Sequence, residues 1–589
     1  MQMFIPTTNI VLHSIWCLAF IVCFAACQRN EMSEHSNTQD ASAQIRYNPD
    51  DYPAPTMQVT GVHAMRVQDL TLLCKVWGFL KYYHPNAART DVYWDGRLLD
   101  MIERVPEWKT ESIRDADLEK LVVGLGAFPL NDTASPLNDS MVALKADLTW
   151  IDSSDISSTL RGLLHKVEHA RRDTCSRYMV PDSVTYAFNG EIATPPSCLR
   201  KVGYRLLALF RFWNGVHYLF AYRTMMDRPW DEALSSFIPR VAESDSTQLF
   251  EEAMLELATW MCDSHVSVSG YQTNLMSMFG NTELCMDVKF IEGKAFVASD
   301  WSDAFSDSKV KRGDEVLAIA GQPVPLLVDR IKRYLPTSNN STLYRDIAWL
   351  IVRTDSPYVK VRVRRGARML TVPVSSGAYG PNPVSKRNER FFRHVGPGNY
   401  GLVDMKYLSV DSLKARSREM RACDGLIVDL RDGMAVCAND ELGEFFLPWP
   451  SMPTKAAIAD LTMPGRFIYI PSYAYGDRNQ RQYKGKVVIM VGASTQSSLE
   501  YTAMILSSAP GADVIGSQTA GADGNIKRLQ LPGGGILTFT GIAVFYPDGG
   551  VTQRTGLRIT KVVDETRKFL TSDQTDEVLD AAMRLVRMK

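Results

Sequence analysis

The sequence predicts a multidomain α/β protein with an N-terminal helical region, a β-rich domain and a C-terminal α/β core built on a layered sheet. Three observations support this fold class. Aromatic-rich helical patterns dominate the first half, short strand patterns run from Glu283 to Ser376, and apolar strands alternate with helices from Asn399. With 589 residues, 45% of them hydrophobic, the chain can form several cores, and we expect three or four domains.

The N-terminal segment has the pattern of an export signal. Residues 10–24 are almost entirely apolar, and two alanines and Cys27 follow them directly. A short apolar run ending in small residues is typical of a secretory signal, and the cysteine resembles the lipidation box of bacterial lipoproteins. We predict a signal peptide over 1–27, lipidation at Cys27 and a flexible tether over 28–60. The alternatives are an ordinary signal peptide and an uncleaved anchor.

Two aromatic-rich segments resemble an internal repeat. LLCKVWGFLKYYHP (72–85) leads to a Trp-Asp pair at 94–95, and RLLALFRFWNGVHY (205–218) leads to another at 230–231. Their apolar spacing predicts helices packed on one core. His84 and His217 are therefore interpreted as structural, because neither has a second metal-type residue at a usual spacing.

The helical region is divided into an N-terminal domain (61–198) and a second helical part (199–280). From about Pro106 to Cys198 the pattern is mixed, and a small inserted β-rich unit is one interpretation. Seven cysteines follow Cys27, and Cys175–Cys198 is the first candidate for a disulfide. Cys262 is interpreted as a buried helix residue.

Residues 281–378 are predicted to form the β-rich domain. Its central stretch, VKRGDEVLAIAGQPV (310–324), resembles a PDZ domain, with turns at Gly313-Asp314 and Gly321 around an apolar strand. PDZ domains bind extended peptides by adding a strand to a sheet edge. Direct peptide binding and a purely bracing role both stay open.

The α/β core is predicted over 390–589. Buried strand patterns occur in DGLIVDLRDG (424–433), GKVVIMVG (485–492) and ADVIGSQTAG (512–521), and ligands of such sheets bind at the strand ends. Ser497 lies where the second of these strands gives way to a helix. A hydroxyl there is raised off the sheet edge, and the free N–H groups of the helix N-terminus can stabilise an oxyanion. Alternatively, the hydroxyls of this turn (Ser494, Thr495, Ser497 and Ser498) only cap the helix.

Distant motifs favour catalysis. Asp263-Ser264-His265 precedes the serine, and SQTAGADGN (517–525), LPGGG (531–535), YPDGG (546–550) and TQRTG (552–556) follow it. With Ser497 three residues before Glu500, these motifs resemble the tail-specific, or C-terminal processing, serine peptidases. The tricorn-core branch fits better than the Ser–Lys branch, because the lysine position of the latter is Ala522 here and Lys527 is out of register. The resemblance covers roughly 200–563.

The resemblance implies a catalytic site. Ser497 is the expected nucleophile and His265 the general base, with Ser264 or Gln553 orienting the imidazole. Gln553 stands where the tricorn branch has a glutamate. The N–H groups of Ser498 and Gly433 would form the oxyanion hole.

Three residues near these motifs have local interpretations. Asp523 and Asp548 read as turn residues, although Asp548 is also a candidate for substrate contact, and Arg431 reads as a local salt-bridge partner.

The predicted function is a serine endopeptidase that acts on peptides or unfolded protein chains in the bacterial cell envelope, through an acyl-enzyme. No metal or cofactor is expected. The charge is balanced, with 65 basic and 66 acidic residues, so nucleic acid is not an expected partner. Besides its substrate, the membrane is the expected partner, through the lipid anchor. The alternatives are a catalytically inactive peptide-binding lipoprotein on the same scaffold and a structural surface lipoprotein. The sequence carries no signal for an oligomeric state.

Overall fold

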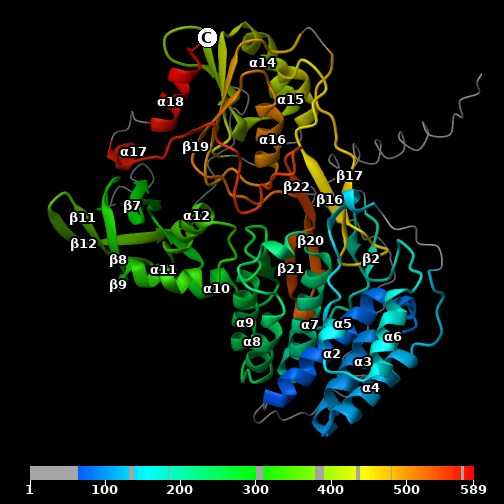
Figure 1. Ribbon diagram of the computed structural model, residues 1–589. Helices are drawn as coiled ribbons and strands as arrows, with labels where there is room; N and C mark the ends of the chain where they lie inside the picture. The colour runs from blue at the N-terminus through cyan, green and yellow to red at the C-terminus, as the bar shows by residue number, and fades with distance from the viewer. Residues whose placement is uncertain are drawn as a thin grey trace, which may run out of the picture.

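The computed structural model describes residues 64–131, 138–182, 185–299, 309–377, 390–432, 438–478, 481–571 and 576–588 (Figure 1). It confirms a multidomain α/β fold, with N-terminal helices, a curled antiparallel sheet and a mostly parallel core sheet. The predicted signal peptide, tether and lipidation site at Cys27 lie outside the described residues. Within the ranges above, no helix has both the length and the hydropathy needed to cross a membrane.

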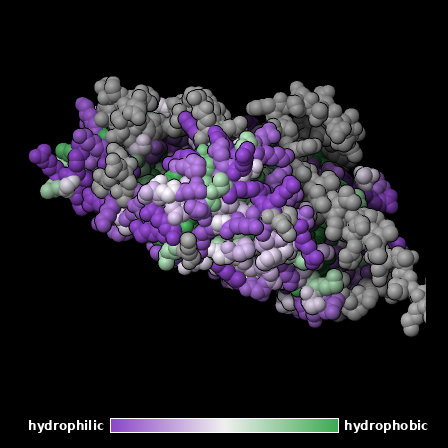
Figure 2. Space-filling model, turned by 90° about the horizontal axis from the view of Figure 1, so that it is seen from above, coloured by the Kyte–Doolittle hydropathy of each residue, from purple (hydrophilic) through white to green (hydrophobic). Residues whose placement is uncertain are grey.

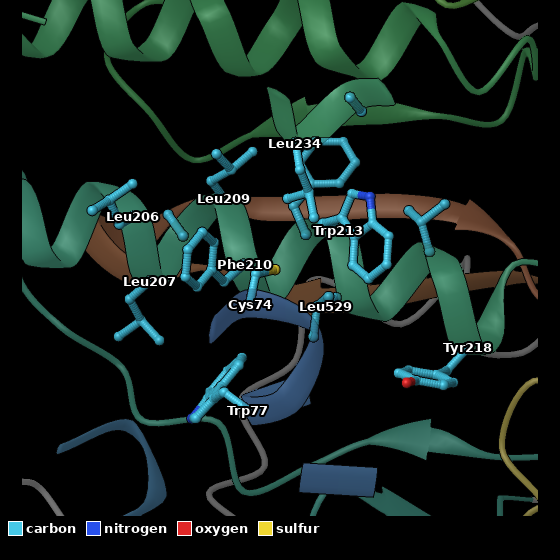
Figure 3. Close-up of a cluster of buried hydrophobic side chains, with 14 of the residues drawn as sticks. Cys74, Trp77, Leu206, Leu207, Leu209, Phe210, Trp213, Tyr218, Leu234 and Leu529 are labelled. Atoms are coloured by element: carbon cyan, nitrogen blue, oxygen red, sulfur yellow. The ribbon is translucent and has the colours of Figure 1, made fainter. Parts of the chain in front are cut away.

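The N-terminal half is a bundle of helices around one large core. The longer helices are α2 (Ala64–Tyr83), α3 (Trp94–Arg104), α4 (Glu111–Val123), α6 (Ser158–Glu168), α7 (Val202–Leu219), α8 (Glu232–Ala242) and α9 (Thr247–Thr259). Side chains of α2, α7 and α8 meet strand β20 (Ile526–Gln530) in this core, as Figure 3 shows. Because α2 and α7–α9 share this core, the division predicted at residue 198 does not separate two cores.

The predicted repeat is confirmed by hydrogen bonding. In the first copy, the indole N–H groups of Trp77 and Trp94 each donate to the other's carbonyl oxygen at 3.2 Å. In the second copy, Trp213 and Trp230 make the same reciprocal pair at 3.0 Å. The two copies also exchange ion pairs, since the residues beside these tryptophans pair as Lys75–Asp231 and Arg211–Asp95.

The stretch between the two copies contains more helix than strand, so the β-rich insert suggested by its sequence is wrong. Helix α4 begins with Thr110 accepting a hydrogen bond from the Ile113 N–H, and Ser157 caps α6 in the same way. Strands there are short: β1 (Val142–Leu144), β2 (Met179–Val180) and β3 (Ala187–Phe188). The charged, Ser-rich composition therefore marks helix caps and also buried ion pairs such as Arg114–Asp115.

The Cys175–Cys198 disulfide is also wrong, because both residues are free cysteines in the structure. The histidines of the helical unit are structural, as predicted. His84 Nδ1 accepts from the Asn86 N–H, and His217 Nε2 lies 3.0 Å from the Asp147 carbonyl oxygen. Burial lowers the pKa of both imidazoles to about 4.

The β-rich module has its own core between a curled antiparallel sheet and two helices, α11 (Val324–Lys332) and α12 (Asn340–Leu350). The sheet order is β10-β5-β12-β11-β8-β7-β6, with β9 added to β8. The strands are β5 (Thr282–Leu284), β6 (Asp287–Ile291), β7 (Lys294–Ser299), β8 (Glu315–Ile319), β9 (Gln322–Pro323), β10 (Arg353–Thr354), β11 (Tyr358–Arg365) and β12 (Arg368–Gly377). Both predicted turn glycines adopt positive φ: 86° at Gly313 and 79° at Gly321.

The C-terminal core is a six-stranded sheet of order β13-β14-β15-β18-β19-β23, parallel except for β13. Helices α14 (Val410–Ala422), α15 (Asn439–Phe446) and α16 (Ser498–Ser507) cover one face, and α18 (Glu577–Leu585) covers the other (Figure 1). The strands are β13 (Phe392–His394), β14 (Tyr400–Asp404), β15 (Gly425–Asp429), β18 (Lys486–Val491), β19 (Asp513–Gly516) and β23 (Lys561–Val562).

Two smaller sheets join the core to the helical unit. One has the order β1-β17-β16-β22, where β16 is Lys455–Ala459, β17 is Phe467–Ile470 and β22 is Ile542–Phe545. The other has the order β20-β21-β4, where β21 is Ile536–Thr540 and β4 is Ser267–Ser269. The β4–β21 pairing brings the Asp-Ser-His motif, just before β4, to the C-terminal part of the chain.

The surface seen in Figure 2 is mainly hydrophilic, with hydrophobic residues in small groups. Among the large hydrophobic side chains that are exposed are Trp349, Trp449 and Met452. Such scattered exposure is ordinary for a folded protein and marks no site by itself.

Candidate active site

Ser497 lies at the junction predicted for it, between β18 and α16, in an unusual backbone conformation. Its φ is +57° and its ψ is −125°, a region that non-glycine residues seldom adopt. It occupies the N-cap position of α16, yet its side chain makes no capping hydrogen bond. The residue is half-buried. The hydroxyl is therefore not used to hold the helix, and this removes the capping interpretation for Ser497.

Other side chains hold the turn around Ser497. The Thr495 hydroxyl accepts from the Gly492 N–H at 3.0 Å and donates to the Leu430 carbonyl oxygen at 2.8 Å. Buried Glu500 accepts from the Thr519 hydroxyl at 2.5 Å, the Gly521 N–H at 2.9 Å and the Ala522 N–H at 3.0 Å. Burial raises the pKa of Glu500.

The loop that Glu500 holds is itself bonded to the serine. The Ser497 N–H donates to the Ala522 carbonyl oxygen at 2.8 Å. The strained turn is thus fixed from both sides, by Thr495 on the strand side and by the 519–522 loop on the other.

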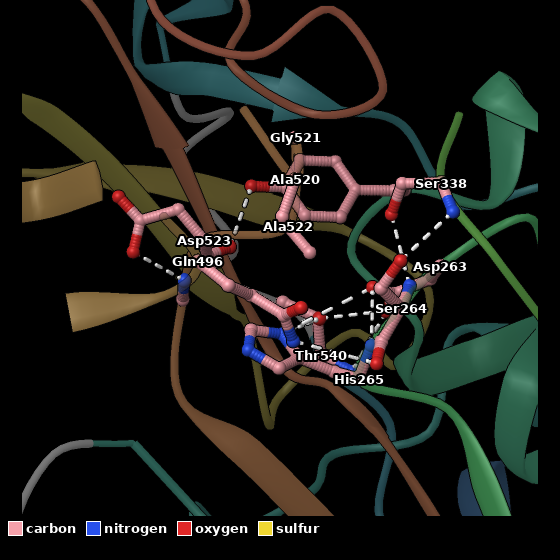
Figure 4. A network of polar contacts seen from close by, with 12 residues as sticks. Asp263, Ser264, His265, Ser338, Gln496, Ala520, Gly521, Ala522, Asp523 and Thr540 are labelled. Atoms are coloured by element: carbon pink, nitrogen blue, oxygen red, sulfur yellow. Dashed lines mark hydrogen bonds and ion pairs between the residues drawn. The ribbon is translucent and has the colours of Figure 1, made fainter. Parts of the chain in front are cut away.

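His265 is held by a chain of two hydrogen bonds (Figure 4). Its Nδ1 lies 2.9 Å from the Thr540 hydroxyl oxygen, and that hydroxyl donates to Asp263 Oδ2 at 2.6 Å. The single Thr540 proton is used on Asp263, so Thr540 accepts from Nδ1–H of the imidazole. Nε2 then carries the lone pair, which is the tautomer required of a general base.

Asp263 fixes the same unit by further bonds. Its Oδ1 accepts from the His265 N–H at 3.1 Å, and its Oδ2 accepts from the Thr540 N–H at 3.3 Å. Asp263 and Thr540 are fully buried. Asp263 lies within the quoted motif but was given no role there, and Thr540 lies in a strand whose sequence does not distinguish it.

Ser264 does not hold the imidazole, contrary to one prediction. Its N–H donates to the Ser338 hydroxyl at 2.9 Å, and its hydroxyl accepts from the Ser338 N–H at 3.0 Å. This reciprocal pair joins the Asp-Ser-His loop to the β-rich module.

Gln553 is not hydrogen-bonded to His265 either. Its side chain is buried, and neither Oε1 nor Nε2 has a hydrogen-bond partner in the part of the chain that the structure describes. The neighbouring Arg554 N–H donates to the Gly521 carbonyl oxygen at 2.7 Å, so Gln553 lies beside the 519–522 loop. The prediction that Gln553 orients the imidazole is therefore wrong for this conformation, and Thr540 with Asp263 does so instead.

The serine turn and the histidine loop are in direct contact. Gln496, the residue before Ser497, donates from Nε2 to the carbonyl oxygen of Ser264, the residue before His265, at 3.5 Å. Two segments separated by more than 200 residues in sequence thus meet at this point (Figure 4).

Residues 399–563 match the model of peptidase family S41. This segment is therefore a peptidase domain of that family. S41 peptidases are serine-type peptidases, so the chain is a serine-type peptidase. No curated protein matches the sequence.

Two solved structures of mature CPAF share the fold of this chain. Mature CPAF complexed with lactacystin has 13% identity and a TM-score of 0.51, over 66% of this chain and 99% of that one. Mature CPAF has 13% identity and a TM-score of 0.50, over 65% and 97% of the two chains. The photosystem II D1 C-terminal processing protease has 15% identity and a TM-score of 0.38, over 64% and 99%.

Of the two residues predicted to donate to the oxyanion, the structure describes only Ser498. Ser498 is the first residue of α16, where the N–H groups have no partner within the helix. Gly433 lies outside the described residues. Arg431 just before it is locally paired, as predicted, through two bonds to Asp429 at 2.8 and 2.9 Å. It also bonds twice to Asp576, the N-cap of α18, at 2.8 Å.

The remaining candidates have no place in the site. Lys527, out of register with the Ser–Lys branch, is buried and forms an ion pair at 2.7 Å with the more exposed Asp182. Asp548 is exposed and pairs with Arg558. Asp523 is buried, and burial together with the Glu500 carboxylate raises its pKa well above its usual range. Within the described residues, no group of His, Cys, Asp and Glu has the arrangement of a metal site.

Proposed function

We propose that this S41 peptidase cleaves peptide bonds by acyl transfer, with Ser497 as nucleophile and His265 as general base. The observation that carries the proposal is an uncapped, strained serine whose neighbour Gln496 contacts the histidine loop, in which the imidazole is held in the tautomer of a base. Asp263 and Thr540 have the orienting role, and Ser264 and Gln553 do not.

Ser497 Oγ attacks the substrate carbonyl carbon while His265 Nε2 takes its proton. The Ser498 N–H, joined by that of Gly433, stabilises the resulting oxyanion. The imidazolium forms beside Thr540, whose oxygen is polarised by Asp263. It then gives its proton to the leaving amine, and water hydrolyses the acyl-enzyme by the same route.

Thr540 offers a test of the relay with a matched control. Thr540→Val is nearly isosteric but breaks the link between imidazole and carboxylate, so kcat is expected to fall about 10–1000-fold. Thr540→Ser keeps the hydroxyl and should retain most of the activity. Both are assayed as kcat per folded enzyme on one unstructured peptide, with thermal unfolding as the stability check. Equal rates for the two variants would exclude the relay.

The substrates in this proposal are peptides or unfolded protein chains. The β-rich module supports this, because β6 is the last strand of its sheet among the described residues, and PDZ domains bind extended peptides by adding a strand to a sheet edge. The location in the proposal is the bacterial cell envelope, with the protein held to the membrane by a lipid on Cys27. Its support is the apolar segment ending in Ala-Ala-Cys.

The anchor is tested by Cys27→Ser. We expect wild-type protein to partition with membranes and to carry acyl chains at an N-terminal Cys27, because several chains hold firmly where one holds weakly. The serine variant should lose the lipid and be found in the soluble fraction or as unprocessed precursor. Mass spectrometry of the mature protein identifies its first residue and any attached lipid. An unmodified N-terminus beyond residue 27 in the wild type would exclude lipidation.

Catalysis itself is tested with a fluorophosphonate probe, which reacts with activated serines. The proposal expects one labelled peptide, modified at Ser497, and competition by an unstructured peptide substrate. Absence of labelling in folded protein that still binds peptide would instead favour the inactive peptide-binding lipoprotein.

A further inference from the structure

The N-terminal end of α12, a helix of the β-rich module, reaches the candidate active site. Asn339 is its N-cap, and its Oδ1 accepts from the Thr342 N–H at 3.0 Å. Its Nδ2 points the other way and lies within donor distance of three carbonyl oxygens: Thr519 at 2.9 Å, Ala520 at 3.0 Å and Arg554 at 3.1 Å. One amide thus caps the helix and joins two loops of the peptidase core.

Six residues further along, Arg345 reaches the serine turn itself. Its Nη1 donates to the Ala493 carbonyl oxygen at 3.0 Å and to Gln496 Oε1 at 2.8 Å. The other end of the Gln496 amide donates to the Ser264 carbonyl oxygen. The arginine therefore holds the side chain that bridges the residues next to Ser497 and His265.

Ser338 completes the contact on the other side of Asn339. It exchanges two hydrogen bonds with Ser264, and its carbonyl oxygen accepts from Arg554 Nε at 3.3 Å. Three residues of this short stretch, Ser338, Asn339 and Arg345, thus bond to the histidine loop, the serine turn, the 519–520 segment and the 554 loop. The opposite face of α12 packs into the module's own core through Leu343, Ile347 and Leu350.

We propose that Asn339 and Arg345 are positioning residues of the active site. Through them, α12 sets the serine turn and the 519–522 loop relative to His265. The inference deepens the proposed function and rests on it. Its physical basis is that Ala522 holds the Ser497 N–H, so a shift of the 519–522 loop moves the nucleophile, and small misplacements cost large factors in rate. The β-rich module is then part of the catalytic unit.

The test is Asn339→Asp compared with Asn274→Asp. Both asparagines are N-caps with a capping box, and aspartate caps equally well, so both helices keep their caps. At Asn274 the Nδ2 donates only to the nearby Tyr271 and Gln272 carbonyl oxygens. At position 339 the substitution places a carboxylate against three carbonyl oxygens of the core. Arg345→Met is the second variant, in case Asn339→Asp folds poorly.

Two readouts are measured on the full chain. For Asn339→Asp and Arg345→Met, kcat and the fluorophosphonate labelling rate should fall about 10–100-fold, with KM within about twofold. Hydrogen exchange should accelerate in peptides covering 492–501 and 518–524. The Asn274→Asp control should match wild type in both.

Unchanged exchange and unchanged kcat in both test variants would overturn the inference. If the wild-type protein proves inactive, the hydrogen-exchange rates of the test variants still test the positioning role. Faster exchange would then support the positioning role, while the missing hydrolysis would count against the proposed function alone.

Discussion

Replacing Ser497 by alanine is expected to abolish peptide hydrolysis and probe labelling while the protein stays folded. Loss of the nucleophile from a Ser–His unit costs about 10⁵–10⁶-fold in kcat. The substitution removes no capping bond, because the Ser497 side chain makes none, so the thermal unfolding temperature should change little. Rates on an unstructured peptide, labelling and a melting curve measure the three quantities.

The matched control for this variant is Ser494→Ala, an exposed serine on the same turn. It should keep wild-type rates. Ser497→Ala should also retain binding of the peptide, measured by fluorescence anisotropy, since the β-rich module is intact. Full hydrolysis by Ser497→Ala would remove the central proposal and make Ser494 or Ser498 the candidate nucleophile.

His265→Ala is expected to be nearly as severe. Without a base, the serine hydroxyl is a weak nucleophile at neutral pH, and kcat should fall by about 10⁴–10⁶-fold. The double variant Ser497→Ala/His265→Ala should be little slower than either single variant, because the two side chains act as one unit. Additive losses in the double variant would show that the two residues do not cooperate.

Lys527→Met is the control for the other family branch. Lys527 is paired with Asp182 away from the serine turn, so the variant should lose stability rather than rate per folded enzyme. A Lys527 variant as inactive as Ser497→Ala, although folded, would mean that lysine is the base.

Much of the fold could be predicted because local patterns and tertiary structure agree. The run GKVVIMVG is buried and apolar, and it forms β18, with Ser497 at the following turn. The repeat was visible because the tryptophans recur with the same spacing. In 106–198 the helices are short, and their caps at Thr110 and Ser157 lie in polar sequence that also suits loops and turns.

The orienting residues of the histidine could not be predicted for a different reason. Thr540 is 275 residues from His265 and meets it only through the pairing of β4 with β21. No short-range pattern encodes that register. The expectation that Gln553 orients His265 rests on motif position alone. A motif position indicates where the backbone of a residue lies, but not the direction of its side chain.

The same pairing of β4 with β21 decides when the molecule acquires activity during its own synthesis. A nascent chain that stops before residue 536 has the Asp-Ser-His loop but lacks both strand β21 and Thr540. Contacts between residues so distant in sequence form late and slowly. The entropy cost of closing a long loop must be met before such contacts can stabilise the fold. The unit of Asp263, Thr540 and His265 can therefore be assembled only after the ribosome has made most of the chain, at least as far as residue 540.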